Sequence, residues 1–511
     1  MSFMDAMKNE MLENFNESVT ENGAVGYRTT GKALLDINFA VASLRSANEG
    51  EIVRRFQAAF LENKVLAMKW LFFARDVRGG LGERRLFRTA MKYIAKYEPE
   101  MARKVVGLIP EYGRYDDLWS LLDDNELRTY VVEFVSQQLT EDVANSRNRK
   151  PISLLGKWMP SANASSATTK RYAKILRNAL EMKESEYRRT LSALRRYTDV
   201  VEVKMSAKMW GEIDYEAVPS RANLIYNGAF LRNDEERRRA FLASLEKGEA
   251  RINASTLFPY DIVHQYCSGG YGRTPKSYDA TIEALWKNLP DLVQGCGNTI
   301  VVADGSGSMT SKVGTSGVSA LEVANSLAIY FAEHSSGEFK NKYITFSERP
   351  QFVDFSNASN LRDKILTALR HSEVANTNIE AVFDLILATA INNNLAQEDI
   401  PANILIISDM EFDGCACTNR SSYGGVNNKL FKVIEQKYKN AGYKLPRLVF
   451  WNVNSRTNTI PVRENDMGVA LVSGFSVNIC KMVMSGKTDP LECLLETLNT
   501  PRYQPVEDAL K

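Results

Sequence analysis

The hexapeptide DGSGSM, at residues 304–309, carries the side chains in this sequence that are best suited to binding a cation. Asp304 offers a carboxylate, and Ser306 and Ser308, two residues apart on a tight turn, can point their hydroxyl oxygens the same way. Hard cations such as Mg²⁺ take oxygen ligands in near-octahedral geometry and often keep several waters. The intervening glycines relieve backbone crowding. The hexapeptide therefore predicts part of a divalent-cation site.

Two further oxygen donors follow later in the chain. Thr377 precedes an apolar, helix-like segment, and Asp409 follows the apolar run ILIIS. Each has a structural alternative, because Thr377 and Glu380 form a capping-box pattern and Asp409 could cap a helix. The full set offers two carboxylates and three hydroxyls, which leaves the coordination shell open to an anionic ligand. We predict a site for Mg²⁺, or another divalent cation such as Mn²⁺ or Ca²⁺, with the ligands Asp304, Ser306, Ser308, Thr377 and Asp409.

Strands that alternate with helices after about Gly295 must position these donors. Such alternation predicts a mainly parallel, doubly wound α/β sheet covered on both faces, in which a ligand binds beyond the C-terminal strand ends. Ser319 and Glu322 form a capping box before one helix. The expected strands are Thr299–Ala303, Lys342–Phe346, Gln351–Phe355, Asn403–Ile407, Leu448–Val453 and Val469–Val472. Further expected helices are Leu361–Arg370, Ile379–Ile391 and Asn428–Asn440.

The earlier part of the chain has a helical texture. Apolar residues recur at helical spacing, as in Ile52, Phe56 and Phe60, and breaks fall at Gly and Pro clusters. Helix pairs with short turns and no exact repeat period predict a HEAT-like or irregular solenoid. We therefore expect a polar N-terminal segment at 1–30, an α-helical repeat-like domain at 31–295, and a metal-binding α/β domain with C-terminal helices at 296–511.

The cation-site residues resemble the metal-ion-dependent adhesion site (MIDAS) of the von Willebrand factor A (vWA) domain. The pattern of that site is D-x-S-x-S followed by a loop Thr and a loop Asp. The resemblance implies that Asp304, Ser306 and Ser308 are ligands, with Thr377 direct and Asp409 direct or through water. It also implies a vWA-like fold and a binding rather than a catalytic role. The sequence departs from the common pattern in having Ser-Asp-Met where Ser-Asp-Gly is more usual.

Six longer segments resemble, as a set, one uncharacterised family of phage, bacterial, plant and giant-virus proteins that joins a helical region to a vWA domain. That family is similar to the Ro autoantigen (TROVE) proteins, ring-shaped RNA-binding proteins made of helical repeats closed by a vWA domain. The resemblance implies RNA as a partner. The segments are RDVRGGLGERRLF (75–87), YGRYDDLW (112–119), KWMPSANASS (157–166), YRRTLSALRRYTDVVE (187–202), VPSRANLIYNGAFLRNDEERRRAF (218–241) and INASTLFPYDIV (252–263).

A basic region agrees with an RNA partner. Between Arg147 and Lys208 the sequence has 15 basic and 5 acidic residues. In the helix predicted for YRRTLSALRRY, arginines seven residues apart share one stripe, whereas Leu191 and Leu194 lie off it and can face the core. Such a stripe can follow a phosphate backbone. The candidate RNA-binding residues are Lys170, Arg171, Lys174, Arg177, Arg188, Arg189, Arg195 and Arg196.

The alternative for this region is a solvated helix face. A pair between Glu184 and Arg188, four residues apart, would neutralise part of the stripe. Tyr172, Tyr187 and Tyr197 could stack on bases, but at helical spacing such aromatics are more often core residues.

Composition excludes several other classes. No apolar run approaches the length of a membrane span, and six cysteines without a zinc-ligand pattern suggest free thiols in a reducing cytoplasm. Ser306 does not match G-x-S-x-G, and RGGLGERR lacks the phosphate-loop pattern, so we expect no enzyme. The leading hypothesis is a cytoplasmic RNA-binding protein organised like Ro, with non-coding, structured or single-stranded RNA on the helical array. The alternative is a metal-dependent protein-interaction module that captures a partner's acidic group.

Overall fold

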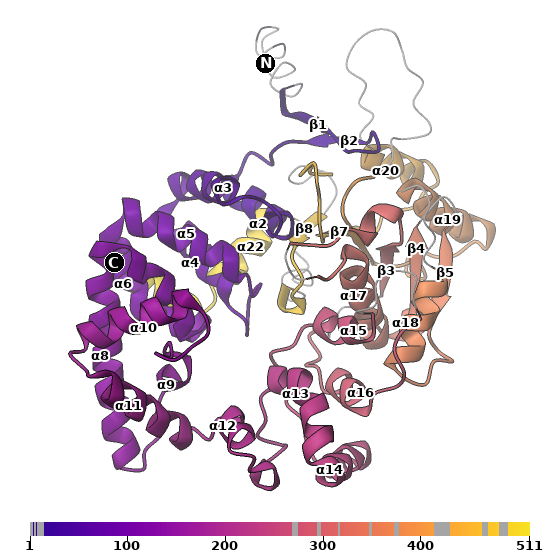
Figure 1. Cartoon of the computed structure of the whole chain (residues 1–511). Helices are drawn as coiled ribbons and strands as arrows, with labels where there is room; N and C mark the ends of the chain where they lie inside the picture. Colours follow the sequence, from indigo (N-terminus) through magenta and orange to yellow (C-terminus); the bar gives the residue numbers. More distant parts are fainter. Residues whose placement is uncertain are drawn as a thin grey trace. The chain divides into compact units, whose positions relative to one another are not determined.

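The computed structural model of the chain contains two compact units, which are described separately (Figure 1). The α/β unit consists of residues 1–63 and 257–497, and the helical unit consists of residues 64–256 and 498–511. No described helix is long and apolar enough to cross a membrane. The structure describes residues 4, 7, 15–267, 274–293, 298–314, 317–346, 350–371, 378–412, 430–461, 469–479 and 489–511.

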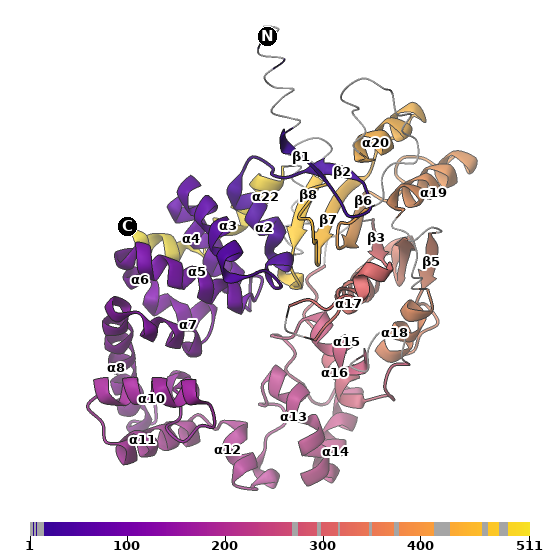
Figure 2. The same ribbon diagram turned by 45° about the horizontal axis from the view of Figure 1, so that its top comes forward.

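A six-stranded sheet in the order β5-β4-β3-β6-β7-β8 forms the centre of the α/β unit (Figure 2). All neighbouring strands are parallel except β4 and β5. Every residue of β3 is buried, because both faces of a parallel sheet are covered. The expected mainly parallel sheet is confirmed, with every strand end within one residue of its expected position. The strands are β3 (Thr299–Asp304), β4 (Lys342–Phe346), β5 (Gln351–Asp354), β6 (Asn403–Ser408), β7 (Arg447–Asn452) and β8 (Val469–Ser473).

Helices cover both faces of this sheet. On one face, α19 and α20 pack against apolar side chains that include Phe450 of β7. On the other face lies α17, whose Phe331 ring is 5.7 Å from the ring of Trp451, the next residue of β7. The capping box of α17 forms as expected, between Ser319 and Glu322. The helices are α2 (Ala33–Leu44), α3 (Glu49–Glu62), α15 (Pro259–Cys267), α16 (Ala280–Lys287), α17 (Ala320–His334), α18 (Leu361–Arg370), α19 (Ile379–Asn392), α20 (Leu430–Asn440) and, at the boundary of the unit, α22 (Pro490–Leu498).

The N-terminal part of the chain adds a hairpin and a buried helix to this unit. The strands of the hairpin are β1 (Glu17–Val19) and β2 (Val25–Tyr27). The backbones of Tyr27 and Ile460 exchange two N–H···O bonds, 2.9 and 2.8 Å long, and α2 packs against β8. Composition placed residues 1–30 in a polar segment and the following helices in the helical domain. In the structure, residues 1–63 group with the α/β unit instead.

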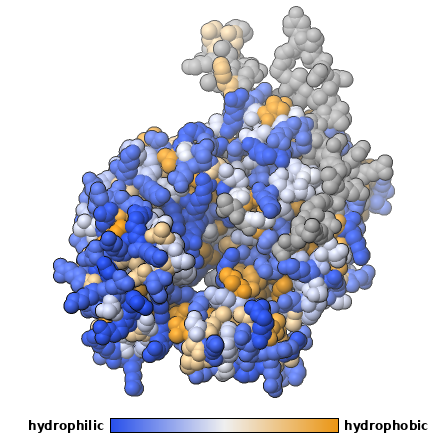
Figure 3. Space-filling model, viewed as in Figure 1, coloured by the Kyte–Doolittle hydropathy of each residue, from blue (hydrophilic) through white to orange (hydrophobic). Residues whose placement is uncertain are grey.

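The helical unit consists of α4 to α14 with the C-terminal helix α23. The face of it visible in Figure 3 is largely hydrophilic. The chain end packs back on the unit, because α23 contacts α4 and α6 and Lys69 Nζ donates to Asn499 Oδ1 at 2.9 Å. The described elements of this unit are helices, which confirms the helical texture expected from the sequence. The elements are α4 (Lys64–Arg75), α5 (Arg84–Tyr97), α6 (Pro99–Val105), η1 (Val106–Leu108), α7 (Ile109–Tyr112), η2 (Tyr115–Asp117), η3 (Trp119–Asp123), α8 (Asn125–Arg147), α9 (Leu155–Trp158), α10 (Ala167–Ala179), α11 (Glu184–Tyr197), α12 (Val201–Ser206), η4 (Trp210–Glu212), α13 (Ser220–Asn233), α14 (Glu235–Lys247) and α23 (Gln504–Leu510).

Candidate metal centre

Asp304 and Asp409 stand at the C-terminal ends of adjacent parallel strands. Asp304 is the last residue of β3, and Asp409 directly follows β6. In the β3–β6 ladder Ala303 lies opposite Ile407, so the two strands end at the same level. This edge is where ligands bind in open parallel sheets. The structure therefore brings the two predicted carboxylates to one edge of the sheet.

Asp304 is fully buried, and both of its carboxylate oxygens accept hydrogen bonds. Oδ1 accepts the Ser306 backbone N–H at 2.9 Å, and Oδ2 accepts the Ser408 hydroxyl at 2.6 Å. The Ser408 oxygen in turn accepts the Met410 backbone N–H at 3.0 Å. These bonds fix the Asp304 side chain and tie it to the loop after β6.

The two serines of the hexapeptide lie beside these carboxylates, at the start of the short helix η5 (Gly307–Thr310). The hydroxyl oxygens of Ser306 and Ser308 are 3.0 Å apart, as their spacing predicts. The Ser308 hydroxyl also interacts with the carboxylate of Asp409 and lowers its pKa. Ser308 therefore links the turn after β3 to the loop after β6.

Burial and neighbouring carboxyl groups, Asp409 for Asp304 and Glu411 for Asp409, disfavour the ionised forms of both carboxyl groups. Burial, together with the neighbouring Asp409, raises the pKa of Asp304 to about 7. Burial also raises the pKa of Asp409, although Ser308 and Arg456 act in the opposite direction. The Arg456 Nη2 atom lies 3.5 Å from Asp409 Oδ2 and 2.8 Å from Glu21 Oε2. Two buried carboxylates are costly unless positive charge compensates for them.

These residues fit a divalent cation. Asp409 Oδ2 is buried and has no hydrogen-bond partner among the described residues. Carboxylate and hydroxyl oxygens are hard donors of the kind that Mg²⁺, Mn²⁺ and Ca²⁺ take. The described residues contain no group of three or more His, Cys, Asp or Glu side chains that could hold a metal ion. A cation held here would therefore use serine hydroxyls and water beside the two carboxylates.

Thr377, the remaining predicted ligand, lies outside the described residues. The helix that follows it, α19, is capped by Asn378, whose side chain accepts the Ala381 backbone N–H at 3.1 Å. Glu380 accepts a hydrogen bond from Lys437 Nζ at 2.7 Å. The structure thus places the N-cap of α19 at Asn378, and the capping-box alternative for Thr377 lies outside the described residues.

Glu411, which the sequence did not single out as a site residue, organises the loop that carries Asp409. Its side chain is fully buried. Its carboxylate accepts the backbone N–H groups of Glu21, Arg456 and Thr457 at 2.9, 2.8 and 2.9 Å. The only sequence signal for this role is its place two residues after Asp409. Glu411 thus joins its own loop to two other backbone segments beside the candidate centre.

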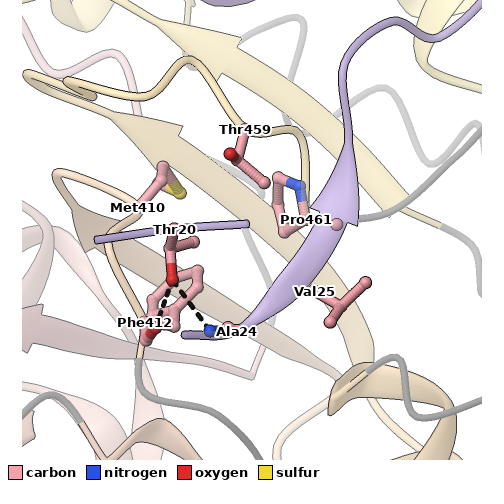
Figure 4. Close-up of a pocket in the computed structure, with 8 residues that line it drawn as sticks. Thr20, Ala24, Val25, Met410, Phe412, Thr459 and Pro461 are labelled. Atoms are coloured by element: carbon pink, nitrogen blue, oxygen red, sulfur yellow. Dashed lines mark hydrogen bonds between the residues drawn. The ribbon is translucent and has the colours of Figure 1, made fainter. Parts of the chain in front are cut away.

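The N-terminal hairpin covers the same loop. The Thr20 hydroxyl donates to the Phe412 carbonyl at 2.6 Å and accepts the Ala24 backbone N–H at 2.9 Å (Figure 4). A small pocket at this contact is also lined by Met410 and Thr459. Met410 has a φ of +62°, in the left-handed region that favours glycine. Its side chain is buried in the core, and this packing offsets the backbone strain at Met410.

The candidate RNA-binding residues lie on α10 and α11 of the helical unit, and both segments are helical as expected. Leu191 and Leu194 are buried as predicted. Tyr187 is also buried, with its hydroxyl 2.8 Å from the Pro160 carbonyl, which confirms its core role. Five cations are exposed and have no ion pair with any described residue: Lys170, Lys174, Arg188, Arg189 and Arg196.

Arg195 is directed into the unit. Its guanidinium donates to the carbonyls of Gly156 and Met159 at 2.9 and 2.8 Å. A third bond, 3.0 Å long, reaches Ser161 Oγ. Burial lowers the pKa of Arg195. These contacts give Arg195 a structural role beside α9, unlike its neighbours on the stripe.

The last two candidates form ion pairs within the unit. Arg171 binds Asp123 at 2.6 Å. Arg177 binds Glu184 at 2.9 Å. Because Glu184 pairs with Arg177, the expected pair between Glu184 and Arg188 is not formed among the described residues. Arg188 therefore keeps its charge exposed, and the neutralising alternative does not apply to it.

Comparisons with known proteins match the two parts of the chain to different families. Residues 298–500 match a family model described as a domain of unknown function, DUF7788. Residues 20–107 and 163–298 match another such model, DUF2828. The chain is also similar to Uncharacterized protein L728 of Acanthamoeba polyphaga mimivirus, with 28% identity over 530 residues. That similarity covers 96% of this chain and 89% of the viral protein, so it includes both units.

Proposed function

We propose that this protein is a divalent-cation-dependent binding protein whose α/β unit is a vWA-like domain with a metal-ion-dependent adhesion site. The observation that carries the proposal is the pair of fully buried carboxylates, Asp304 and Asp409, at the ends of adjacent parallel strands. Two serine hydroxyls accompany them, and one carboxylate oxygen has no hydrogen-bond partner among the described residues. Their mutual repulsion is a cost that a cation relieves.

Asp304, Ser306, Ser308 and Asp409 would hold the cation, with Thr377 as a further ligand. A bound Mg²⁺ or Mn²⁺ supplies positive charge and open coordination positions for an acidic group of a protein partner. The protein's own contribution is to fix these oxygens, through the Ser408 bond to Asp304 and the Glu411 bonds that hold the neighbouring loop. The proposed role is binding, and no catalytic step is assigned to these residues.

Calorimetric titration of the EDTA-treated full-length protein with MgCl2 and MnCl2 tests this proposal. The wild type is expected to bind saturably. Asp304→Ala and Asp409→Ala are each expected to bind more than about tenfold more weakly, because each loses a charged ligand. Glu398→Ala, which removes an exposed carboxylate from the same unit, is the matched control. Absence of saturable binding by the wild type, or undiminished binding by Asp304→Ala, would contradict the proposal.

A second candidate function, RNA binding, is favoured by the exposed cations of α10 and α11. Five of these side chains have no ion pair with a described residue. Exposed cations along neighbouring helices bind phosphate backbones through counterion release. On this proposal the protein is organised like Ro and acts in the cytoplasm. The helical array binds non-coding, structured or single-stranded RNA.

Fluorescence anisotropy with single-stranded and hairpin RNA at several salt concentrations tests the second candidate. The double variant Arg188→Glu/Arg189→Glu is expected to reduce the slope of log affinity against log salt by about 1.4. Each phosphate contact with a single strand contributes about 0.7 to this slope, and the variant loses two contacts. Reversal of two exposed arginines elsewhere in the unit, Arg232→Glu/Arg239→Glu, is the matched control. Arg195 stays unchanged because it supports α9. Failure of the wild type to bind either RNA at low salt would remove this candidate and leave the cation proposal intact.

A further inference from the structure

Three sequence segments that take no part in the proposed cation site meet in the helical unit. They are residues 75–87, 112–119 and 157–166. The first contains the end of α4 and the start of α5, the second forms η2, and the third contains the end of α9. The element η2 contacts α9, and η3, which follows it, contacts α5. Their charged side chains form what we call the arginine cluster: Arg75, Arg84, Arg88, Arg114, Asp116 and Asp117.

Asp117 is the buried centre of the arginine cluster. Its side chain is 0% exposed and pairs with Arg75, which is 2% exposed, at 2.8 Å. Arg88 Nε binds its other oxygen at 2.7 Å, and its Oδ2 accepts the Arg114 backbone N–H at 3.0 Å. These bonds satisfy Asp117 and hold η2 against α4 and α5. They give Arg75 a structural role.

Asp116 is the second carboxylate of the cluster. Arg84 pairs with it, Arg114 Nε lies 3.0 Å from its Oδ1, and Arg88 Nη2 lies 3.5 Å from its Oδ2. Among the described residues, the four arginines of the cluster have ion pairs only with its two carboxylates. Two positive charges therefore remain in excess. Burial and repulsion from Arg88 and Arg114 lower the pKa of Arg84, as expected for crowded guanidinium groups.

The excess charge reaches solvent through three of the arginines. The side chains of Arg84, Arg114 and Arg88 are 42%, 34% and 27% exposed. The Nε atom of Arg84 is itself buried, 3.4 Å from Asp117 Oδ1, and has no hydrogen-bond partner among the described residues. Arg84 is also the first residue of the 14-residue helix α5, and Glu83 makes no side-chain cap there. Backbone N–H groups at such a helix start favour an anion. Trp158 supports Arg114, whose Cζ lies 4.2 Å from the ring centroid.

We propose that Arg84, Arg88 and Arg114, with the N-terminal end of α5, bind a dianionic phosphate group, either inorganic phosphate or a phosphate monoester. Such a group carries about 1.5 to 2 negative charges near pH 7 and three strong acceptor oxygens. Its charge matches the two excess positive charges of the cluster. The planar guanidinium group binds two phosphate oxygens at once, which an ammonium group cannot do in the same geometry. The site is separate from the cation centre and does not depend on it.

Titration of the full-length protein with inorganic phosphate in EDTA, at constant ionic strength set with chloride, tests the proposal. The wild type is expected to bind phosphate saturably at pH 7.5 and more weakly at pH 5.5, where the phosphate is mostly monoanionic. Arg84→Gln and Arg114→Gln are each expected to weaken binding about tenfold or more, the equivalent of one charge-assisted hydrogen bond. Arg239→Gln, on α14, is the matched control.

Arg84→Lys separates binding from folding. Lysine keeps the charge that pairs with Asp116, so the melting temperature is expected to stay close to that of the wild type. Phosphate affinity is expected to fall several-fold, because the two-oxygen contact is lost. A wild type that responds to phosphate no more than to chloride would overturn the proposal. The same holds if Arg239→Gln loses as much affinity as Arg84→Gln.

The source of the phosphate group is distinguished by two further probes. Adenosine 5′-monophosphate represents a small phosphate monoester. A short RNA with a 5′-phosphate, compared with the same RNA bearing a 5′-hydroxyl, represents a nucleic-acid end. Tighter binding of the 5′-phosphorylated RNA, lost in Arg84→Gln, assigns the site to RNA ends. If the two RNAs bind equally, and Arg84→Gln loses the binding of the mononucleotide or of phosphate, the site is assigned to a small ligand.

Discussion

Replacing Asp304 with Asn separates the cost of two buried carboxylates from the benefit of the cation they are proposed to hold. Asparagine has the same shape as aspartate but cannot ionise. Its Oδ1 can still accept the Ser306 backbone N–H, which is bonded at 2.9 Å in the wild type. Its amide can donate to the Ser408 oxygen, reversing the 2.6 Å bond that the hydroxyl now donates. The substitution therefore removes charge with little loss of hydrogen bonding.

The pKa of Asp304 sets the size of the effect. Burial and repulsion by Asp409 raise this pKa from 3.8 to about 7. A carboxyl group whose pKa is raised by folding stabilises the folded state when it is protonated. This contribution is lost as the pH rises from the pKa of the unfolded state to the pKa of the folded state. Each tenfold change in proton affinity corresponds to about 1.4 kcal/mol. The metal-free wild type is therefore expected to lose roughly 4 kcal/mol between about pH 4 and pH 7, and Asp304→Asn is not.

Differential scanning calorimetry in EDTA and in MgCl2, at pH 5 and pH 8, measures the prediction. In EDTA at pH 8, Asp304→Asn is expected to melt at a higher temperature than the wild type, and at pH 5 the difference shrinks. Saturating Mg²⁺ is expected to raise the melting temperature of the wild type, by the equivalent of about 2.7 kcal/mol at 100 times the dissociation constant, but not that of Asp304→Asn. Glu398→Gln serves as the control. The reasoning is refuted if the variant melts lower than the wild type in EDTA at pH 8, or if Mg²⁺ leaves the wild type unchanged.

Three further predictions follow from the contacts around the two candidate sites. Met410→Gly is expected to lower the free energy of unfolding in urea by about 1–3 kcal/mol, because lost side-chain packing exceeds the relief of left-handed strain; a stabilised variant would contradict this account. Glu411→Gln is expected to cost about 2–4 kcal/mol and to expose the N-terminal hairpin to limited proteolysis, whereas unchanged protection would argue against its role. Arg195→Gln is expected to lower the melting temperature but to change RNA affinity less than about twofold, and a loss like that of the Arg188 and Arg189 reversal would reassign it to the RNA face.

The sequence predicted most of the candidate cation site because the site depends on strand ends. Each apolar run fixes the position of a strand, and the polar residue that ends the run then falls at the C-terminal edge of a parallel sheet. Asp304 and Asp409 follow this rule, and the two-residue spacing of Ser306 and Ser308 suffices to bring their hydroxyls together. The role of Glu411 did not follow in this way. Its backbone partners come from two segments that are distant in the sequence, and no local pattern encodes such contacts.

The same limit applies to the assignment of elements to units. A polar composition at residues 15–30 gave no sign of a hairpin, because short strands of three residues carry almost no periodic signal. The helix α2 lies in the stretch whose texture predicted helices in general, but that texture does not specify which core each helix joins. Nine of its 12 residues are buried, and it packs against α3 as well as β7 and β8, as expected for a helix that is apolar over most of its surface.

The basic stripe of α11 shows how residues in equivalent helical positions can acquire different roles. Arg188 and Arg195 are seven residues apart and share one stripe, as the sequence predicted. Yet Arg195 turns towards the α9 loop, where three acceptors surround it, whereas Arg188 has no ion pair with a described residue. Periodicity gives the direction of a side chain from the helix axis, but the surrounding loops determine whether that direction leads to solvent or to protein. A stripe of like charge is therefore evidence for a ligand surface only at the positions that loops leave uncovered.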